Sequence, residues 1–114
     1  MDTLSISEAR RLALAAQGLH LPRPRAVTSS AIAAVIRRLG LVQLDFVNVT
    51  GPAHYQVIFS RLGKYDRKLL DDLIYRSGEF TEQWAHEASI IPVETWPLLR
   101  FRREAFRLRP WNIE

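Results

Sequence analysis

The stretch that decides the fold is Leu41-Val42-Gln43-Leu44-Asp45-Phe46-Val47-Asn48-Val49, an apolar run with three polar interruptions. Its β-branched and aromatic side chains are typical of a strand. Because successive side chains of a strand point to opposite faces, Gln43 and Asp45 are predicted to share one face. A carboxamide and a carboxylate side by side can hold a water molecule or face a developing positive charge. This segment is therefore a candidate reaction centre.

Two helices are predicted before this strand. Ser5 and Glu8 match a capping box,, and apolar residues recur at helical spacing from there to Gly18. A second helix is predicted from Thr28 or Ser29 to Gly40. Its buried stripe is predicted to comprise Ile32, Val35, Ile36 and Leu39. The two prolines in Leu21-Pro22-Arg23-Pro24-Arg25 predict an extended connector between these helices,.

After the strand at residues 41–49, the sequence predicts two further helices, a strand pair and a last helix. The third helix opens at Gly51-Pro52 and stops at Gly63, and the fourth begins at Asp66 and ends near Gly78,. The residues predicted to point inward are Tyr55, Ile58, Phe59 and Leu62 in the third helix and Leu69, Leu70, Leu73 and Ile74 in the fourth. One or two short strands are expected between Phe80 and Ile91, and a last helix after Pro97.

This order of elements predicts a mainly α chain with short β-strands, an α+β class, arranged as a winged helix-turn-helix-like domain. A plain helical bundle is the alternative, and Val47-Asn48-Val49-Thr50-Gly51 argues against it. Residues 1–91 are expected to form the winged-helix-like domain with the candidate site. Residues 92–114 are expected to form a basic and aromatic C-terminal helix, the start of a second unit.

The composition limits the possible function classes. With 114 residues and 47% hydrophobic side chains, the chain can form one domain with a core,. It has no cysteine, which excludes disulfide scaffolds and thiolate metal sites,. His54 and His86 have no third ligand at suitable spacing, so we expect no metal and no cofactor. No apolar run could span a bilayer and no secretory signal is evident, so we expect a cytoplasmic protein without a membrane partner.

The charge favours a nucleic-acid partner. The net charge is +4, and the basic residues are arginines except for Lys64 and Lys68. Arginine binds phosphate bidentately and stacks on bases. The arginines of the last helix form either a phosphate-contacting face or a solvated surface; they are Arg100, Arg102, Arg103, Arg107 and Arg109. The aromatic residues among them could promote self-association if they are exposed; they are Trp96, Phe101, Phe106 and Trp111.

Several motifs together resemble the YcaQ/AlkZ-type family of bacterial winged-helix DNA glycosylases. In chain order they are Ser7-Glu8-Ala9-Arg10-Arg11-Leu12, Gln43-Leu44-Asp45-Phe46-Val47-Asn48-Val49, Ala53-His54-Tyr55, Phe59-Ser60-Arg61-Leu62-Gly63, Tyr65-Asp66 and Trp84-Ala85-His86-Glu87-Ala88-Ser89-Ile90-Ile91-Pro92. The resemblance runs from about Leu4 to Phe106. It implies a monofunctional glycosylase that acts on alkylated purines in double-stranded DNA, including interstrand cross-links at N7. Family chains are several times longer and contain tandem winged-helix units, so this sequence resembles their N-terminal portion.

The resemblance assigns catalysis to Gln43 and Asp45, which match the family's Gln-x-Asp motif. An N7-alkylated guanine is positively charged and leaves as a neutral base, so the sugar becomes oxocarbenium-like. The Asp45 carboxylate suits stabilising that cation and accepting a proton from water, and Gln43 suits holding the water. The alternative is a polar strand edge with Asp45 paired to an arginine. Neither lysine is placed as a nucleophile, so hydrolysis without strand cleavage is expected.

A second group of residues is expected to contact DNA. Its members are His54, Tyr55, Arg61, Trp84, His86, Glu87, Arg100, Arg102 and Arg103. Trp84, His86 and Glu87 could line the lesion site, with the tryptophan stacking on a base. The alternatives are a histidine satisfied inside the wing for His86 and a structural histidine for His54. The rival functions are a non-catalytic winged-helix DNA-binding module and a protein-interaction domain.

Overall fold

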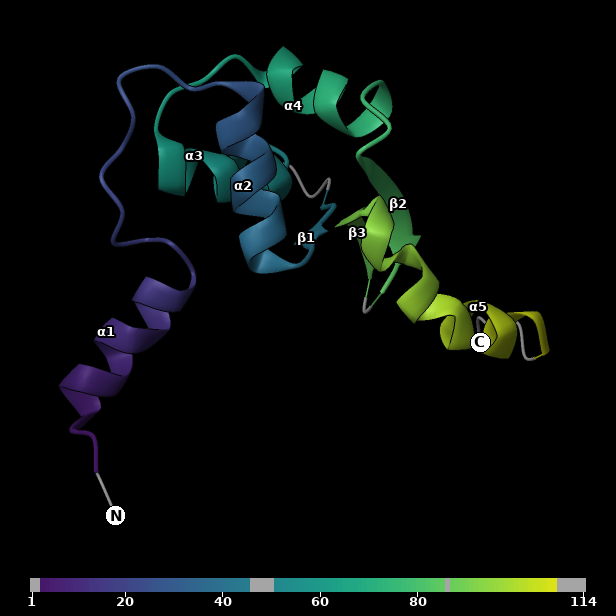
Figure 1. The fold of residues 1–114 in the computed structure, drawn as a ribbon, viewed down its shortest axis with the longest axis horizontal. Coiled ribbons are helices and arrows are strands. Elements are labelled where there is room, and N and C mark those ends of the chain that lie inside the picture. The colour runs from purple at the N-terminus through teal and green to yellow at the C-terminus, as the bar shows by residue number, and fades with distance from the viewer. Residues whose placement is uncertain (1–2, 46–50, 86, 109–114) are drawn as a thin grey trace.

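The computed structural model describes residues 3–45, 51–85 and 87–108. The elements are α1 (Ile6–Ala16), α2 (Ser29–Leu39), β1 (Val42–Gln43), α3 (Ala53–Leu62), α4 (Arg67–Tyr75), β2 (Phe80–Trp84), β3 (Ala88–Pro92), the 3₁₀ helix η1 (Val93–Leu99) and α5 (Arg100–Leu108). Most described residues are helical, and the strands form one small antiparallel sheet (Figure 1). The predicted α+β class is confirmed, and the helical-bundle alternative is wrong.

The sheet has the strand order β1-β3-β2, with β2 and β3 forming a hairpin. β1 pairs with β3 through Val42 opposite Ile90 and Gln43 opposite Ser89. The strand predicted over residues 41–49 is therefore shorter than expected, and residues 46–50 lie outside the described part. The chain leaves the sheet at Asp45, whose carbonyl oxygen accepts a hydrogen bond from the Ala53 amide of α3 (3.1 Å). The first turn of α3 thus replaces β3 as the partner of this backbone.

The core lies between α2, α3, α4 and one face of the sheet. Ile32 and Ile36 of α2, Ile58 of α3 and Ile90 of β3 are completely buried. α2 contacts α3, α4 and β3, so it is the central helix (Figure 1). Its predicted stripe is confirmed: Val35 is also buried and Leu39 packs against the same cluster. Burying this apolar surface is the main stabilising contribution to the fold.

The predicted helix ends are confirmed where a side chain can cap them. The Ser5 hydroxyl accepts a hydrogen bond from the Glu8 amide, and the Glu8 carboxylate accepts one from the Ser5 amide. Thr28 and Asp66 cap α2 and α4 in the same way, by accepting from main-chain amides. Gly63 ends α3 with φ +82°, a conformation that side chains other than glycine rarely adopt,. Capping depends on neighbours in the sequence, which is why the sequence predicts it well.

One inward-facing residue of α3 was predicted wrongly. Phe59 is 46% exposed, whereas His54 is only 4% exposed. Since His54 and Ile58 are four residues apart, they lie on one helical face, and Phe59 lies on the next face round the helix. The exposed Phe59 ring instead lies beneath the guanidinium of Arg23, 5.9 Å from its centre.

The two ends of the described chain lie outside the core. α1 extends away from the body, as do η1 and α5 on the other side (Figure 1). α1, which is described throughout, buries none of its side chains, so Ile6, Leu12 and Leu14 are exposed. β3 continues through Pro92, and η1 contacts both β2 and β3. A domain division between residues 91 and 92 therefore stays a prediction. None of the described helices is long and apolar enough to cross a membrane.

Candidate functional site

Gln43 and Asp45 lie where the chain passes from β1 to α3. Val42 and Leu44, the residues that alternate with them, are 3% and 7% exposed. Gln43 is exposed and Asp45 is half-buried. The predicted alternation is therefore observed: the apolar partners enter the core, and the two polar side chains lie away from it.

The backbone around Asp45 is fixed on both sides. The amide of Leu44 donates to the carbonyl oxygen of Ala88 in β3 (2.8 Å), and the carbonyl oxygen of Asp45 accepts from Ala53 in α3 (3.1 Å). β1 is antiparallel to β3, so continuing its register by two positions beyond Gln43 places Asp45 level with Glu87,. Asp45 therefore lies at the same end of the sheet as the β2–β3 hairpin turn. Two of the predicted DNA-contacting residues, Trp84 and Glu87, belong to this hairpin.

A polar row crosses the sheet from Gln43. Gln43 is opposite Ser89, and Ser89 is opposite Gln83 on its other side. Paired residues of an antiparallel sheet project from the same face. Ser89 is almost fully buried, with its hydroxyl donating to the carbonyl oxygen of Glu87 (3.0 Å). Gln83 accepts a hydrogen bond from Arg103 of α5 (3.3 Å). The row therefore joins the candidate site to the C-terminal helix.

Arg103 of α5 contacts both η1 and the sheet. Its guanidinium lies 3.5 Å from the centre of the Trp96 ring and donates to the Trp96 carbonyl oxygen (2.8 Å). Arg100 pairs with Glu104 one turn further on (2.6 Å). Arg102 is exposed. Of the three arginines of α5 predicted to contact DNA, Arg102 is the one that forms no hydrogen bond or ion pair with another described residue.

A partly buried cluster of Tyr55, Tyr65, Arg67 and Asp71 joins α3 to α4. The Tyr55 hydroxyl donates to Asp71 (2.7 Å), and the Arg67 guanidinium lies 4.8 Å from the centre of the Tyr55 ring. The Tyr65 hydroxyl donates to the Tyr55 carbonyl oxygen (3.2 Å). Burial raises the pKa of Tyr65 to about 12 and, together with the Asp71 hydrogen bond, raises the pKa of Tyr55. Both phenols therefore stay protonated and keep donating throughout the neutral range.

The remaining predicted DNA contacts differ in accessibility. His54 is buried, with its ring 4.3 Å from that of Tyr55, which favours the structural alternative. Arg61 donates to the carbonyl oxygens of Gln17 (2.8 Å) and Val57 (2.9 Å) and so joins α3 to the end of α1. Trp84 is 43% exposed and Glu87 is half-buried. His86 lies outside the described residues. The DNA-binding roles of all these residues stay predictions.

Ser89 and Gln83 were not among the site residues predicted from the sequence, whereas Glu87, which lies level with Asp45, was. Ser89 is the one polar side chain in Ala88-Ser89-Ile90-Ile91-Pro92, which is the signal that was available. An open hollow lined by Ser29, Ser30, Ala33, Ala34, Arg37, Leu73 and Glu79 lies between α2 and α4, away from these residues. Across the described ranges, no three His, Cys, Asp or Glu side chains are grouped so that they could hold a metal ion.

The burial of His54 predicts a pH-dependent stability. Burial, the largest effect, lowers the pKa of His54 below its usual 6.5, although the Asp71 carboxylate opposes this. Between pH 6.5 and the lowered value, the unfolded chain binds a proton that the folded chain does not, so the free energy of unfolding should fall as the pH falls. Urea unfolding of the wild type between pH 7 and pH 5 measures this slope.

His54→Gln should flatten the slope, whereas the matched variant His20→Gln, at an exposed histidine, should leave it as it is. Parallel curves for the wild type and His54→Gln would contradict the assignment.

Comparison with known protein families gives one match. Residues 36–113 match the family model described as DNA glycosylase AlkZ-like. The matched region is more than half of the chain and contains β1, α3, α4, the β2–β3 hairpin, η1 and α5. It begins in the second half of α2, so the resemblance at residues 4–35 lies outside the match. No solved structure matches the chain.

Proposed function

The chain belongs to the DNA glycosylase AlkZ-like family, and on that premise we propose that it hydrolyses the N-glycosidic bond of N7-alkylated purines in double-stranded DNA. Family membership gives it a DNA glycosylase role in DNA repair. Beyond that role, we propose that the damaged base is an alkylated purine and that the protein also unhooks interstrand cross-links at N7.

The observation that supports this proposal is the position of Asp45. Asp45 is half-buried at the end of the sheet, two residues after Gln43, and its carbonyl oxygen is held by the first turn of α3. A carboxylate held in this way is preorganised, and preorganised charge is often the largest contribution to catalysis. Partial burial also weakens the screening of its charge by water.

The proposed reaction begins with cleavage of the bond between C1′ and the base nitrogen N9. Its electron pair moves into the purine ring and neutralises the positive charge that alkylation placed there. The sugar is left as an oxocarbenium-like centre, which the Asp45 carboxylate stabilises. Gln43 holds a water molecule that attacks C1′, and the proton of that water passes to Asp45. The products are the free alkylated base and an abasic site.

The lysines favour hydrolysis over strand cleavage. A lyase reaction requires an amine nucleophile. The chain has only Lys64 and Lys68. Lys64 lies in the turn between α3 and α4, and Lys68 lies in the first turn of α4, where it pairs with Asp72. Neither belongs to β1 or to the β2–β3 hairpin.

The test is base release from a duplex that contains a single 7-methylguanine, analysed by chromatography of the freed base. We expect 7-methylguanine to appear, with the strand intact until the abasic site is cleaved by heating in alkali. An undamaged duplex of the same sequence is the control. Strand cleavage without alkali would contradict hydrolysis, and binding without base release would favour the non-catalytic DNA-binding module.

The structure gives little support to the alternative of a non-catalytic DNA-binding module. A sequence-reading module needs exposed polar side chains on its recognition helix. In the first turn of α3, His54 is buried and the Tyr55 hydroxyl is engaged with Asp71, which leaves Gln56 exposed. We therefore place the enzyme ahead of the module.

We also predict self-association through the C-terminal aromatic residues. Phe101 and Phe106 of α5 are 64% and 52% exposed, and Leu98 of η1 is 74% exposed. Apolar surface of this extent favours association. Sedimentation should show a concentration-dependent dimer for the wild type and a monomer for the variant Phe101→Glu/Phe106→Glu. A wild type that stays monomeric at all concentrations would disprove this prediction.

A further inference from the structure

The N-terminal third of the chain contains a long stretch without carboxylates. Residues 9–44 contain six arginines and no aspartate or glutamate. The stretch includes most of α1, the connector, all of α2 and β1. The candidate site at Gln43 and Asp45 begins at its end.

Five of these arginines have no carboxylate partner among the described residues. Arg37 is the exception, because it pairs with Glu79 (3.0 Å) and Glu94 (3.1 Å). The others are exposed and form no ion pair with any residue that the structure describes. They are Arg10, Arg11, Arg23, Arg25 and Arg38. Their charge is available to a binding partner.

The connector is attached to the body of the domain. The Nε of Arg61 donates to the Gln17 carbonyl oxygen (2.8 Å). Gly18 is buried, and a Cβ at this position would lie 3.0 Å from the Cδ of Arg38. Further along, the Cδ of Arg23 lies 3.3 Å from where a Cβ of Gly63 would be, which places Arg23 against the end of α3.

The prolines restrict how Arg23 and Arg25 are presented. Pro22 and Pro24 fix their own φ angles and favour an extended backbone in the residues before them. In an extended polyproline-type backbone, Arg23 and Arg25 are about 6 Å apart along the chain. A DNA strand places one phosphate about every 3.4 Å along the helix axis, so this separation spans about two phosphates. Restricted backbone freedom also lowers the entropic cost of binding.

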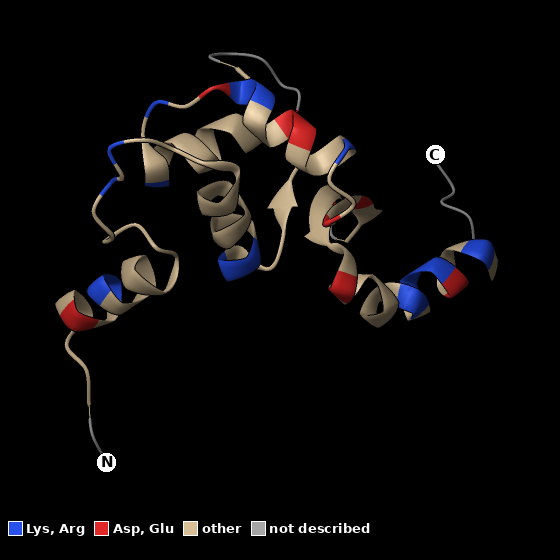
Figure 2. Ribbon diagram, turned by 45° about the horizontal axis from the view of Figure 1, so that its top comes forward, with Lys and Arg blue, Asp and Glu red and all other residues tan. Residues whose placement is uncertain are grey.

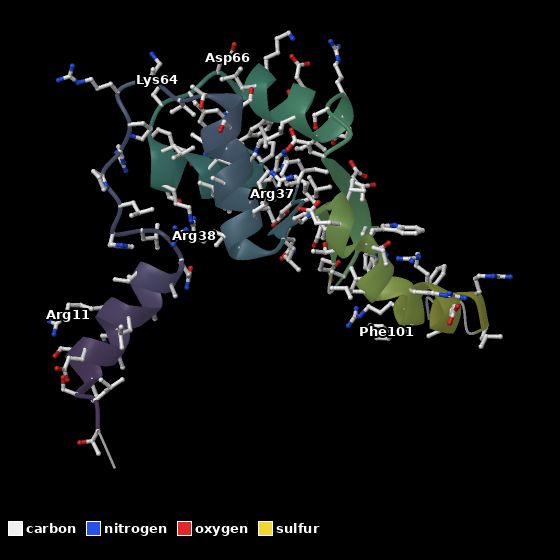
Figure 3. The ribbon with its side chains drawn as sticks, viewed as in Figure 1. Arg11, Arg37, Arg38, Lys64, Asp66 and Phe101 are labelled. Carbon is white, nitrogen blue, oxygen red and sulfur yellow. The ribbon has the colours of Figure 1, made fainter. Side chains whose placement is uncertain are left out.

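Lys64 extends the same surface. It follows Gly63 in the turn between α3 and α4, next to Arg23. Figure 2 shows the basic positions of the connector and of this turn near one another, with no acidic residue on the connector. Figure 3 shows Arg11, Arg38 and Lys64 on this side of the molecule. We call the surface formed by Arg10, Arg11, Arg23, Arg25, Arg38 and Lys64 the basic arm.

We propose that the basic arm binds the sugar–phosphate backbone of duplex DNA, whether or not a lesion is present. It would bind every sequence alike, because phosphates carry no sequence information. The inference rests on the proposed function only in taking DNA as the ligand. Its test uses undamaged DNA and requires no base release.

The experiment measures the affinity for an undamaged duplex by fluorescence anisotropy between 50 and 200 mM salt. Each neutralised phosphate contributes about −0.9 to the slope of log K against log salt. Arg23→Gln/Arg25→Gln should therefore make the slope shallower by about two and weaken binding at least about tenfold at 0.1 M salt. The loss should be the same for a duplex with 7-methylguanine.

Two further variants make the result specific. Arg23→Lys/Arg25→Lys keeps the charge and should restore most of the slope. Arg76→Gln removes an exposed arginine that pairs with Asp72 at the end of α4, and it should leave the slope unchanged. Thermal unfolding of each variant checks that it remains folded.

The proposal is overturned by an unchanged slope in Arg23→Gln/Arg25→Gln, by an equal loss in Arg76→Gln, or by a loss confined to the damaged duplex. Tighter binding to vesicles with anionic phospholipid than to the duplex would also overturn it. If the wild type binds undamaged DNA through the arm but releases no 7-methylguanine, the proposed function fails and the basic arm stands.

Discussion

Asp45→Asn should lower the single-turnover rate of 7-methylguanine release by about 10²–10⁴-fold. Asparagine keeps the shape of the side chain but removes its negative charge, so it can neither stabilise the oxocarbenium-like sugar nor accept a proton from water. The backbone bonds that place this residue, from Leu44 to Ala88 and from Ala53 to Asp45, do not involve the side chain. DNA affinity should therefore change little. The rate is measured with enzyme in excess over a duplex that contains one 7-methylguanine.

Glu82→Gln is the matched control for this variant. Glu82 is a carboxylate of the same sheet, but it is opposite Ile90 in the row next to that of Gln43, and it accepts a hydrogen bond from Tyr75. The control should keep the wild-type rate. Equal rates for the wild type and Asp45→Asn would disprove the assignment of Asp45. A larger loss in Glu87→Gln than in Asp45→Asn would transfer the carboxylate role to the hairpin, which the register places level with Asp45.

Features that depend on neighbours in the sequence could be predicted well. The capping box at Ser5, the cap at Asp66 and the ends of the helices at glycine need only a few adjacent residues,. The alternation around Gln43 is of the same kind, because a buried residue on either side of a polar one is a property of a strand. The sequence therefore predicted which side of β1 the candidate site occupies.

Features that depend on long-range packing could not be predicted. The helical spacing of α1 correctly indicated a helix but not that its apolar face would remain exposed, because packing requires a partner that a sequence pattern does not identify. For a similar reason, the sequence predicted Phe59 on the inner face of α3, whereas the structure has His54 there. A half-apolar helix can rotate by one residue, and tertiary contacts such as that of Arg23 with Phe59 decide between the alternatives,.

The candidate site illustrates both cases. Gln43 and Asp45 could be identified because they interrupt an apolar run. Ser89, Gln83 and Arg103 are more than 35 residues away in the sequence, and only the register of the sheet and the packing of α5 bring them into one row. A register is set by the whole set of buried residues on two strands, not by one local motif.

Ile90→Ala should lower the free energy of unfolding by about 2–5 kcal/mol. Ile90 is completely buried in the central strand, where it is opposite Val42 of β1. Removing its outer carbons leaves a cavity that α2 and the neighbouring strands cannot fill without losing their own contacts. The loss is large for a domain of this size, since total stability is about 5–15 kcal/mol. Urea unfolding measures the loss from the shift in midpoint at unchanged slope.

Two variants bracket this result. Ile90→Val removes a single carbon and should cost about 0.5–1.5 kcal/mol. Leu98→Ala, at a position of η1 that is 74% exposed, should change stability by less than about 0.5 kcal/mol,. A loss below about 1 kcal/mol for Ile90→Ala would contradict the burial of β3. Val42 packs in the same core cluster as Ile90 and is followed directly by Gln43. The position of the candidate site therefore depends on the packing of β1. The folded Ile90→Ala variant should accordingly also release 7-methylguanine more slowly.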